Sequence, residues 1–176
     1  MEKNPTRPLA VGLIVLGALT RLLPHPANMV PVGGLSLFAG ARLRGWRALA
    51  VPLMMMLVTD PLLGGFSFAT PFVYASFLIN VWIGMRLRGT ESPWKIGGAA
   101  AVGATQFFLI SNFGTWLGST SFYPHTLPGL MACYVAAIPF YWRTLAGDVF
   151  YSAAFFGIYA LVRHTLEQNP ARVELR

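Results

Sequence analysis

The sequence predicts an all-α integral membrane protein with six transmembrane helices, and the placement of its positive charges is the main reason. Of the 13 Lys and Arg residues among 176, all but Arg21 and Arg143 fall into four clusters separated by long apolar runs. The clusters are Lys3 and Arg7; Arg42, Arg44 and Arg47; Arg86, Arg88 and Lys95; and Arg163, Arg172 and Arg176. Because Lys and Arg mark cytoplasmic loops, this alternation indicates an even number of spans with both termini in the cytoplasm.

The composition supports a single membrane domain over residues 1–176. The chain is 55% hydrophobic and only 11% charged, whereas about a quarter of the residues in soluble domains are charged. Its net charge of +7 is distributed at the borders of apolar runs, where the anionic inner leaflet is the natural partner. We therefore expect the lipid bilayer, and no nucleic acid, as its partner. Cys133 is the only cysteine, which excludes an internal disulfide.

The first two expected spans are residues 8–23 and 31–43. The first is interpreted as a retained helix and not a signal peptide, because no small-residue cleavage motif follows it. The second is shorter than the about 20 residues that usually cross a bilayer. We nevertheless expect it to cross, since otherwise Arg42, Arg44 and Arg47 would lie outside the cell.

The middle of the chain predicts three spans with ordinary features, at residues 46–63, 71–86 and 96–117. The third of these begins with the small residues Gly97-Gly98-Ala99-Ala100-Ala101. Small residues allow close approach of a neighbouring membrane helix, so we expect tight packing at this end.

The apolar stretch over residues 127–163 is too long for one span of ordinary tilt. Pro139 lies within it, and proline interrupts helices. We expect a short outer helix over about residues 127–138 and a final span over residues 140–163.

Ionisable residues inside apolar spans are costly and are candidates for function. Arg21 and Asp60 both fall at the predicted outer ends of their spans, and we expect them to be neighbours. Arg143 and Asp148 are five residues apart on one helix and face different ways, so each is expected to meet another helix. The open alternative is that these charges only hold helices together.

A substrate site is predicted on the outer side, where cations, a carboxylate, amides and aromatic rings gather. Ligand pockets combine an apolar wall with a few convergent polar groups. Aromatic rings stack on planar ligands, and arginine binds carboxylate or phosphate. The connections at residues 24–30 and 119–126 are expected to roof the site. The predicted substrate-binding residues are Arg21, His25, Asn28, Asp60, Asn112, Trp116, Tyr123, Tyr141 and Arg143.

No pattern for metal, cofactor or catalytic chemistry stands out. His25 and His125 lie in different connections without HxH or HExxH spacing, so no metal site is predicted. The chain also has no Walker motif for hydrolysing ATP. We therefore predict that it is no enzyme. The open alternative is a membrane-embedded enzyme that uses Asp60, Asp148 or His25 as acid or base.

Three segments carry a resemblance to a family of uncharacterised small bacterial membrane proteins. They are Arg21-Leu-Leu-Pro-His-Pro, Ser111-Asn-Phe-Gly-Thr-Trp and Tyr123-Pro-His-Thr-Leu-Pro-Gly-Leu-Met-Ala-Cys-Tyr-Val-Ala-Ala-Ile-Pro-Phe, followed by Thr144-Leu-Ala-Gly-Asp-Val. That family is similar to the S-components of energy-coupling factor (ECF) transporters.

The resemblance implies a substrate-binding subunit of the bacterial cytoplasmic membrane for uptake of a vitamin or related micronutrient. It also implies an ECF S-component-like bundle and a shared ECF transmembrane subunit with two ATPases as partners. One departure is that the first span has Ala10, Gly12, Gly17 and Ala18 in place of the Ala-xxx-Ala surface that S-components often present there. The alternative function is a non-transporting scaffold or assembly protein of the cell envelope.

Overall fold

The computed structural model describes residues 6–23, 28–118 and 121–168, and this part of the chain contains helices and no strands. The helices are α1 (Thr6–Thr20), α2 (Val32–Arg42), α3 (Trp46–Leu63), α4 (Thr70–Met85), α5 (Pro93–Gly118) and α6 (Leu127–Gln168). Three of them, α3, α5 and α6, are long and apolar enough to cross a membrane, while α1 and α4 are apolar but shorter. The predicted all-α class is confirmed.

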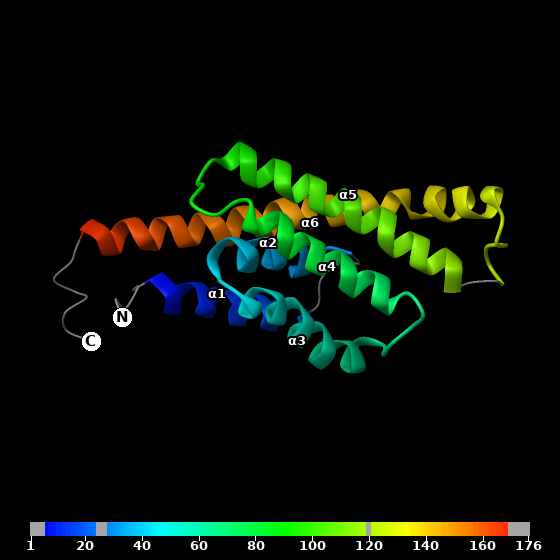
Figure 1. Cartoon of the computed structure of the whole chain (residues 1–176), viewed down its shortest axis with the longest axis horizontal. Coiled ribbons are helices and arrows are strands. Elements are labelled where there is room, and N and C mark those ends of the chain that lie inside the picture. Colours follow the sequence, from blue (N-terminus) through cyan, green and yellow to red (C-terminus); the bar gives the residue numbers. More distant parts are fainter. Residues whose placement is uncertain (1–5, 24–27, 119–120, 169–176) are drawn as a thin grey trace.

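The helices form three layers, with α2 and α4 in the middle, α5 and α6 on one side and α1 and α3 on the other (Figure 1). The start of α1, the end of α6 and the α2–α3 and α4–α5 connections lie at one end of the bundle. We call this the basic end, because Arg42, Arg44, Arg86 and Arg88 lie there. The α3–α4 and α5–α6 connections lie at the opposite end, so the helix directions agree with the predicted alternation of charge.

Helix α2 is the centre of the bundle. Every residue from Val32 to Ala41 is buried, and the helix contacts each of the other five helices. Its 11 residues rise only ~16 Å, about half of the ~30 Å hydrocarbon core. The segment predicted as a span at residues 31–43 is therefore a helix of half length that is covered by protein, a setting in which short segments are tolerated in membranes.

Glycines bring α2 against its neighbours at backbone distance. A side chain at Gly84 of α4 would overlap the carbonyl of Leu37, and one at Gly40 would overlap the carbonyl of Val81. On the side facing α6, a methyl group at Gly34 would lie 2.8 Å from the backbone nitrogen of Ser152. Such close approach is the usual role of small residues in membrane helices.

Both ends of α2 receive a hydrogen-bonding side chain from elsewhere in the fold. At its N-terminus the cap residue Pro31 has no side-chain acceptor, and the buried carboxylate of Asp148 in α6 accepts a hydrogen bond from the Gly34 backbone N–H. At its C-terminus Arg88 donates to the carbonyls of Gly40 and Leu43, at 3.2 and 3.0 Å. A hydrogen-bond acceptor at the N-terminus satisfies an otherwise free backbone N–H, and positive charge at the C-terminus stabilises a helix.

The expected separate outer helix at residues 127–138 is not formed, because α6 continues unbroken through Pro139. Proline removes one backbone hydrogen bond, but membrane helices that pack against other helices tolerate it. Here the Tyr134 hydroxyl donates to the Leu109 carbonyl at 2.8 Å, and the Cys133 thiol lies 3.5 Å from the Asn112 carbonyl. These contacts hold the first part of α6 along α5.

The close packing of α5 includes Ala100, which is fully buried, and extends beyond the predicted residues 97–101. A methyl group at Gly97 would meet no atom within 4 Å, whereas one at Gly103 would lie 2.6 Å from Oδ1 of Asn80 in α4. One turn further along, Gln106 donates to Asn80 Oδ1 at 3.0 Å and to the Ser76 carbonyl at 2.9 Å. A polar contact between α4 and α5 thus marks one tight point, which lies further along α5 than residues 97–101.

Candidate functional site

Arg21 and Asp60 form a salt bridge of 2.6 Å, as predicted. Arg21 also donates to the hydroxyl of Thr59, and the Tyr74 hydroxyl donates to the second carboxylate oxygen of Asp60 at 2.8 Å. Asp60 is only 9% exposed, and both of its oxygens have partners. This network joins the end of α1 to α3 and α4, and its geometry is that of a structural contact between helices.

A cavity of about 210 Å³ lies between α5 and α6, in the half of the bundle away from the basic end. We call it the α5–α6 cavity. It contains three of the predicted site residues, which come from the segment before α2, from α5 and from α6. Its lining residues are Asn28, Phe107, Phe108, Ser111, Asn112, Thr115, Ala137, Phe140, Tyr141 and Thr144.

The aromatic wall of this cavity is held in place by ring contacts and one hydrogen bond. The centre of the Phe108 ring lies 5.1 Å from that of Tyr141 and 5.6 Å from that of Tyr134. The Tyr141 hydroxyl lies 3.0 Å from the Thr105 hydroxyl. Rings at these separations stabilise one another, so the wall is preformed and presents flat apolar surface.

Two amide side chains supply the polar part of the cavity. The Asn112 amide nitrogen donates to the Phe108 carbonyl at 2.8 Å, and within the described part of the chain no donor is assigned to its side-chain oxygen. Asn28 has a left-handed backbone with φ of 64°, a conformation that asparagine adopts more readily than most residues. The cavity therefore offers hydrogen-bonding groups beside an aromatic wall.

Trp116 has a different role from the predicted one, and His125 shares it. The Trp116 indole donates to the Pro124 carbonyl at 3.0 Å, and His125 Nε2 lies 3.1 Å from the Trp116 carbonyl. The two rings are 5.2 Å apart. These contacts tie the end of α5 to the α5–α6 connection, and neither Trp116 nor Tyr123 is among the residues that line the cavity.

The expected single cluster of site residues is divided in the structure. Arg21 and Asp60 meet among α1, α3 and α4, on the side of the bundle away from α5 and α6 (Figure 1). Arg143 is exposed on α6, with no ion-pair partner in the described ranges. The predicted residue His25 and the roof residues 24–27 and 119–120 lie outside the described residues.

The apolar lining residues were not identified in the sequence, because a phenylalanine in an apolar helix is unremarkable. Spacing is the signal that would have found them. Ser111 and Thr115 are one helical turn apart on α5, and the α6 lining recurs with helical periodicity. The lining positions on α6 are Ala137, Phe140, Tyr141 and Thr144.

Within residues 6–23, 28–118 and 121–168, no group of three or more His, Cys, Asp or Glu side chains is placed to hold a metal ion. Among the residues that the structure describes, none that lines the α5–α6 cavity is charged. The site therefore suits recognition of a neutral chemical group by stacking and hydrogen bonding.

The fold and the cavity define a helical membrane protein with a candidate small-molecule site. The chain belongs to DUF6580, a family of unknown function, whose model matches residues 1–171. This supports the predicted membership of an uncharacterised family, whereas the similarity to ECF S-components stays a prediction. No curated protein and no solved structure matches the chain.

Proposed function

We propose that the protein is a substrate-binding membrane subunit for uptake of a vitamin or related micronutrient, with the α5–α6 cavity as its binding site. The observation that carries the proposal is the convergence of Asn28, Asn112 and Tyr141 on one aromatic-walled cavity. By the positive-inside rule the basic end faces the cytoplasm. The cavity then lies in the outer half of the bundle, on the side from which a nutrient arrives.

The chemistry of the cavity narrows the class of ligand. Its volume of about 210 Å³ is below the ~300–1,000 Å³ of sites for drug-sized ligands, so it suits a small molecule or one ring of a larger one. A planar ring fits against Phe108 and Tyr141, and the Asn112 oxygen suits an N–H or O–H donor. Because the described lining carries no charge, the recognised part is neutral, unlike the carboxylate or phosphate expected for Arg21 and Arg143.

The membrane arrangement and partners belong to the same proposal. The chain is multi-pass in the bacterial cytoplasmic membrane, with six helices, an ECF S-component-like bundle and both termini in the cytoplasm. Since its sequence contains no nucleotide-binding motif, a shared ECF transmembrane subunit with two ATPases supplies the energy. The close helix contacts along α2 support a rigid bundle that such a partner moves as one body.

Native mass spectrometry of the gently purified protein tests the proposal. A bound small molecule distinct from lipid and detergent is the expected result, and fragmentation identifies its class. Cells that lack the protein are then expected to take up the identified compound more slowly. The protein is purified from cells grown in rich medium, so that nutrients are present. Spectra of this protein that contain only lipid and detergent adducts would contradict the proposal.

A scaffold of the cell envelope is the second candidate, and one observation favours it. Most of the buried charge serves contacts between helices: Arg21 and Asp60 bind each other, and Asp148 binds the N-terminus of α2. In a scaffold the α5–α6 cavity would be a packing defect. Filling it would then leave the phenotype of cells unchanged, whereas it would abolish uptake by a transport subunit.

A further inference from the structure

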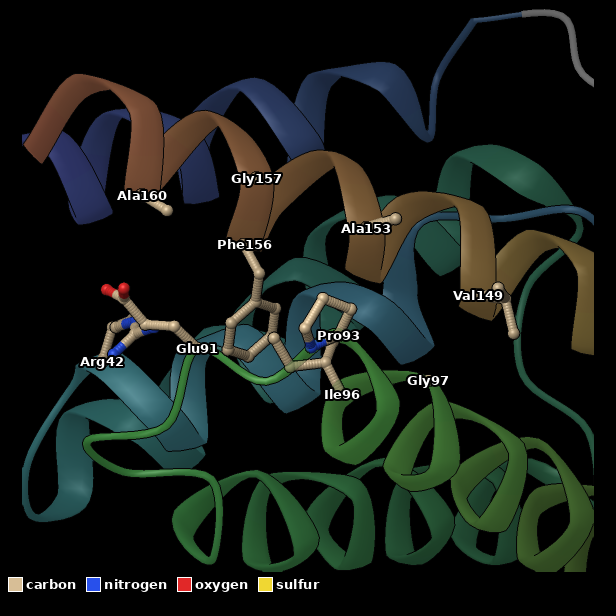
Figure 2. Close-up of a pocket in the computed structure, with 10 residues that line it drawn as sticks. All are labelled: Arg42, Glu91, Pro93, Ile96, Gly97, Val149, Ala153, Phe156, Gly157 and Ala160. Atoms are coloured by element: carbon tan, nitrogen blue, oxygen red, sulfur yellow. The ribbon is translucent and has the colours of Figure 1, made fainter. Parts of the chain in front are cut away.

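A second cavity, of about 370 Å³, lies at the basic end between the start of α5 and the second half of α6 (Figure 2). We call it the basic-end cavity. Figure 2 shows Phe156 pointing from α6 toward Pro93, with Arg42 and Glu91 at one end of the space. Apart from these two charged residues the lining is apolar, and it includes Ile96, Gly97, Ala153 and Gly157.

The cavity exists because two helices stay apart at their smallest residues. A methyl group at Gly97 or at Gly157 would meet no atom within 4 Å, whereas one at Gly103 would press on Asn80. The lining on α6 runs from Val149 to Ala160, a rise of ~16 Å along the helix. An elongated apolar space at a membrane helix surface suits a hydrocarbon chain, because water gains no hydrogen bonds there.

The charged end of this cavity contains an arginine with unused binding capacity. The Arg42 guanidinium lies over the rings of Tyr159 and Phe156, at 4.6 and 5.2 Å from their centres. Its Nε is buried without a hydrogen-bond partner, and its hydrogen bond to the Thr90 carbonyl is long at 3.4 Å. In the described residues no carboxylate forms a salt bridge with Arg42, and the nearby Glu91 forms one with Arg163.

We propose that the basic-end cavity binds an anionic phospholipid of the inner leaflet, with one acyl chain along α6 and the phosphate at Arg42. Guanidinium groups bind phosphate by charge-assisted hydrogen bonds, and basic pockets between membrane helices on the cytoplasmic side bind anionic headgroups. Glu91 does not oppose this, since Arg163 neutralises it. The arginines at the basic end favour an anionic over a zwitterionic lipid.

The test measures which lipids the full-length protein retains. The protein is reconstituted into nanodiscs containing equal amounts of phosphatidylglycerol and phosphatidylethanolamine, and the retained lipids are counted by native mass spectrometry after release into mild detergent. Wild type is expected to retain phosphatidylglycerol several-fold over phosphatidylethanolamine. Arg42→Gln is expected to lose this preference and Arg42→Lys to keep most of it. Arg47→Gln, an exposed arginine at the same end, is the matched control and is expected to behave as wild type.

Filling the apolar part of the basic-end cavity tests binding of the acyl chain separately from binding of the phosphate at Arg42. Gly157→Leu projects into open space, so it is expected to fold, checked by circular dichroism, and to reduce retention of both lipids at least fivefold. Ala153→Leu, also in the lining, repeats the test. Phosphatidylglycerol retention unchanged in Arg42→Gln, or unchanged in both filled variants, would overturn the proposal. Release of the lipid by millimolar glycerol phosphate would do so too, because it would assign Arg42 to a soluble anion.

Discussion

The N-terminus of α2 provides a prediction in which one substitution has opposite effects in two backgrounds. A methyl group at Gly33 would overlap the carboxylate of Asp148, and overpacking of a buried site costs about 1–3 kcal/mol. Replacing glycine by alanine in a helix returns about 1 kcal/mol, so Gly33→Ala is expected to destabilise the wild type by up to about 2 kcal/mol. Asp148→Ala leaves the Gly34 N–H without its acceptor and is expected to cost about 1–3 kcal/mol.

In the Asp148→Ala background the obstacle at Gly33 is gone. Gly33→Ala is then expected to be neutral or to stabilise by up to about 1 kcal/mol, so that the two changes are strongly non-additive. The assay is reversible unfolding in mixed micelles with increasing SDS, followed by circular dichroism. Gly12→Ala, where a methyl group meets nothing within 4 Å, is the control and is expected to have the same effect in both backgrounds. Equal destabilisation by Gly33→Ala with and without Asp148 would refute the assigned contact.

Two further predictions concern the ion pair and the membrane topology. Arg21→Ala and Asp60→Ala are each expected to destabilise the protein by about 3 kcal/mol, because each leaves a buried charge unpaired. In the same SDS assay the double variant is expected to lose less stability than the sum of the two single variants. Additive losses would mean that the 2.6 Å bridge is not a coupled pair. In a Cys133→Ser background, a cysteine at Ser67 is expected to react with a membrane-impermeant maleimide in intact cells, and one at Arg44 only after lysis. The reverse labelling would contradict the assignment of the basic end to the cytoplasm.

The sequence predicted the helices well where one local signal was sufficient. Clusters of arginine between apolar runs divide the chain into segments, and the bounds predicted for the third helix, residues 46–63, coincide with α3. The signal was less informative at Pro139, where α6 continues and its first part packs along α5 through contacts that are remote in sequence. The complete burial of α2 could not be predicted either. Its glycines and serine permit close packing, but they do not reveal which helices surround it.

The candidate site was predicted in part for the same reason. Asn28, Asn112 and Tyr141 stand out because they are polar or aromatic at expected helix ends, and they converge on one cavity. The partners of charged residues depend on contacts that are remote in sequence. Arg21 meets Asp60 as expected, but Asp148 meets a backbone amide of α2 and not a cation, and no spacing rule within one helix identifies such a partner.

The most direct test of the central claim compares ligand occupancy in a filled and an unfilled cavity. Ala137 lines the α5–α6 cavity and is buried, whereas its neighbour Ala136 is exposed and outside the lining. Native mass spectra of wild type, Ala137→Phe and the control Ala136→Phe, purified side by side, give the fraction of protein carrying the small molecule. The proposed function predicts that wild type and Ala136→Phe carry it equally, and that Ala137→Phe loses at least nine-tenths of it, which requires a loss of at least about 1.4 kcal/mol in binding. Equal occupancy in all three proteins, or a bound molecule in none of them, would contradict a substrate site between α5 and α6.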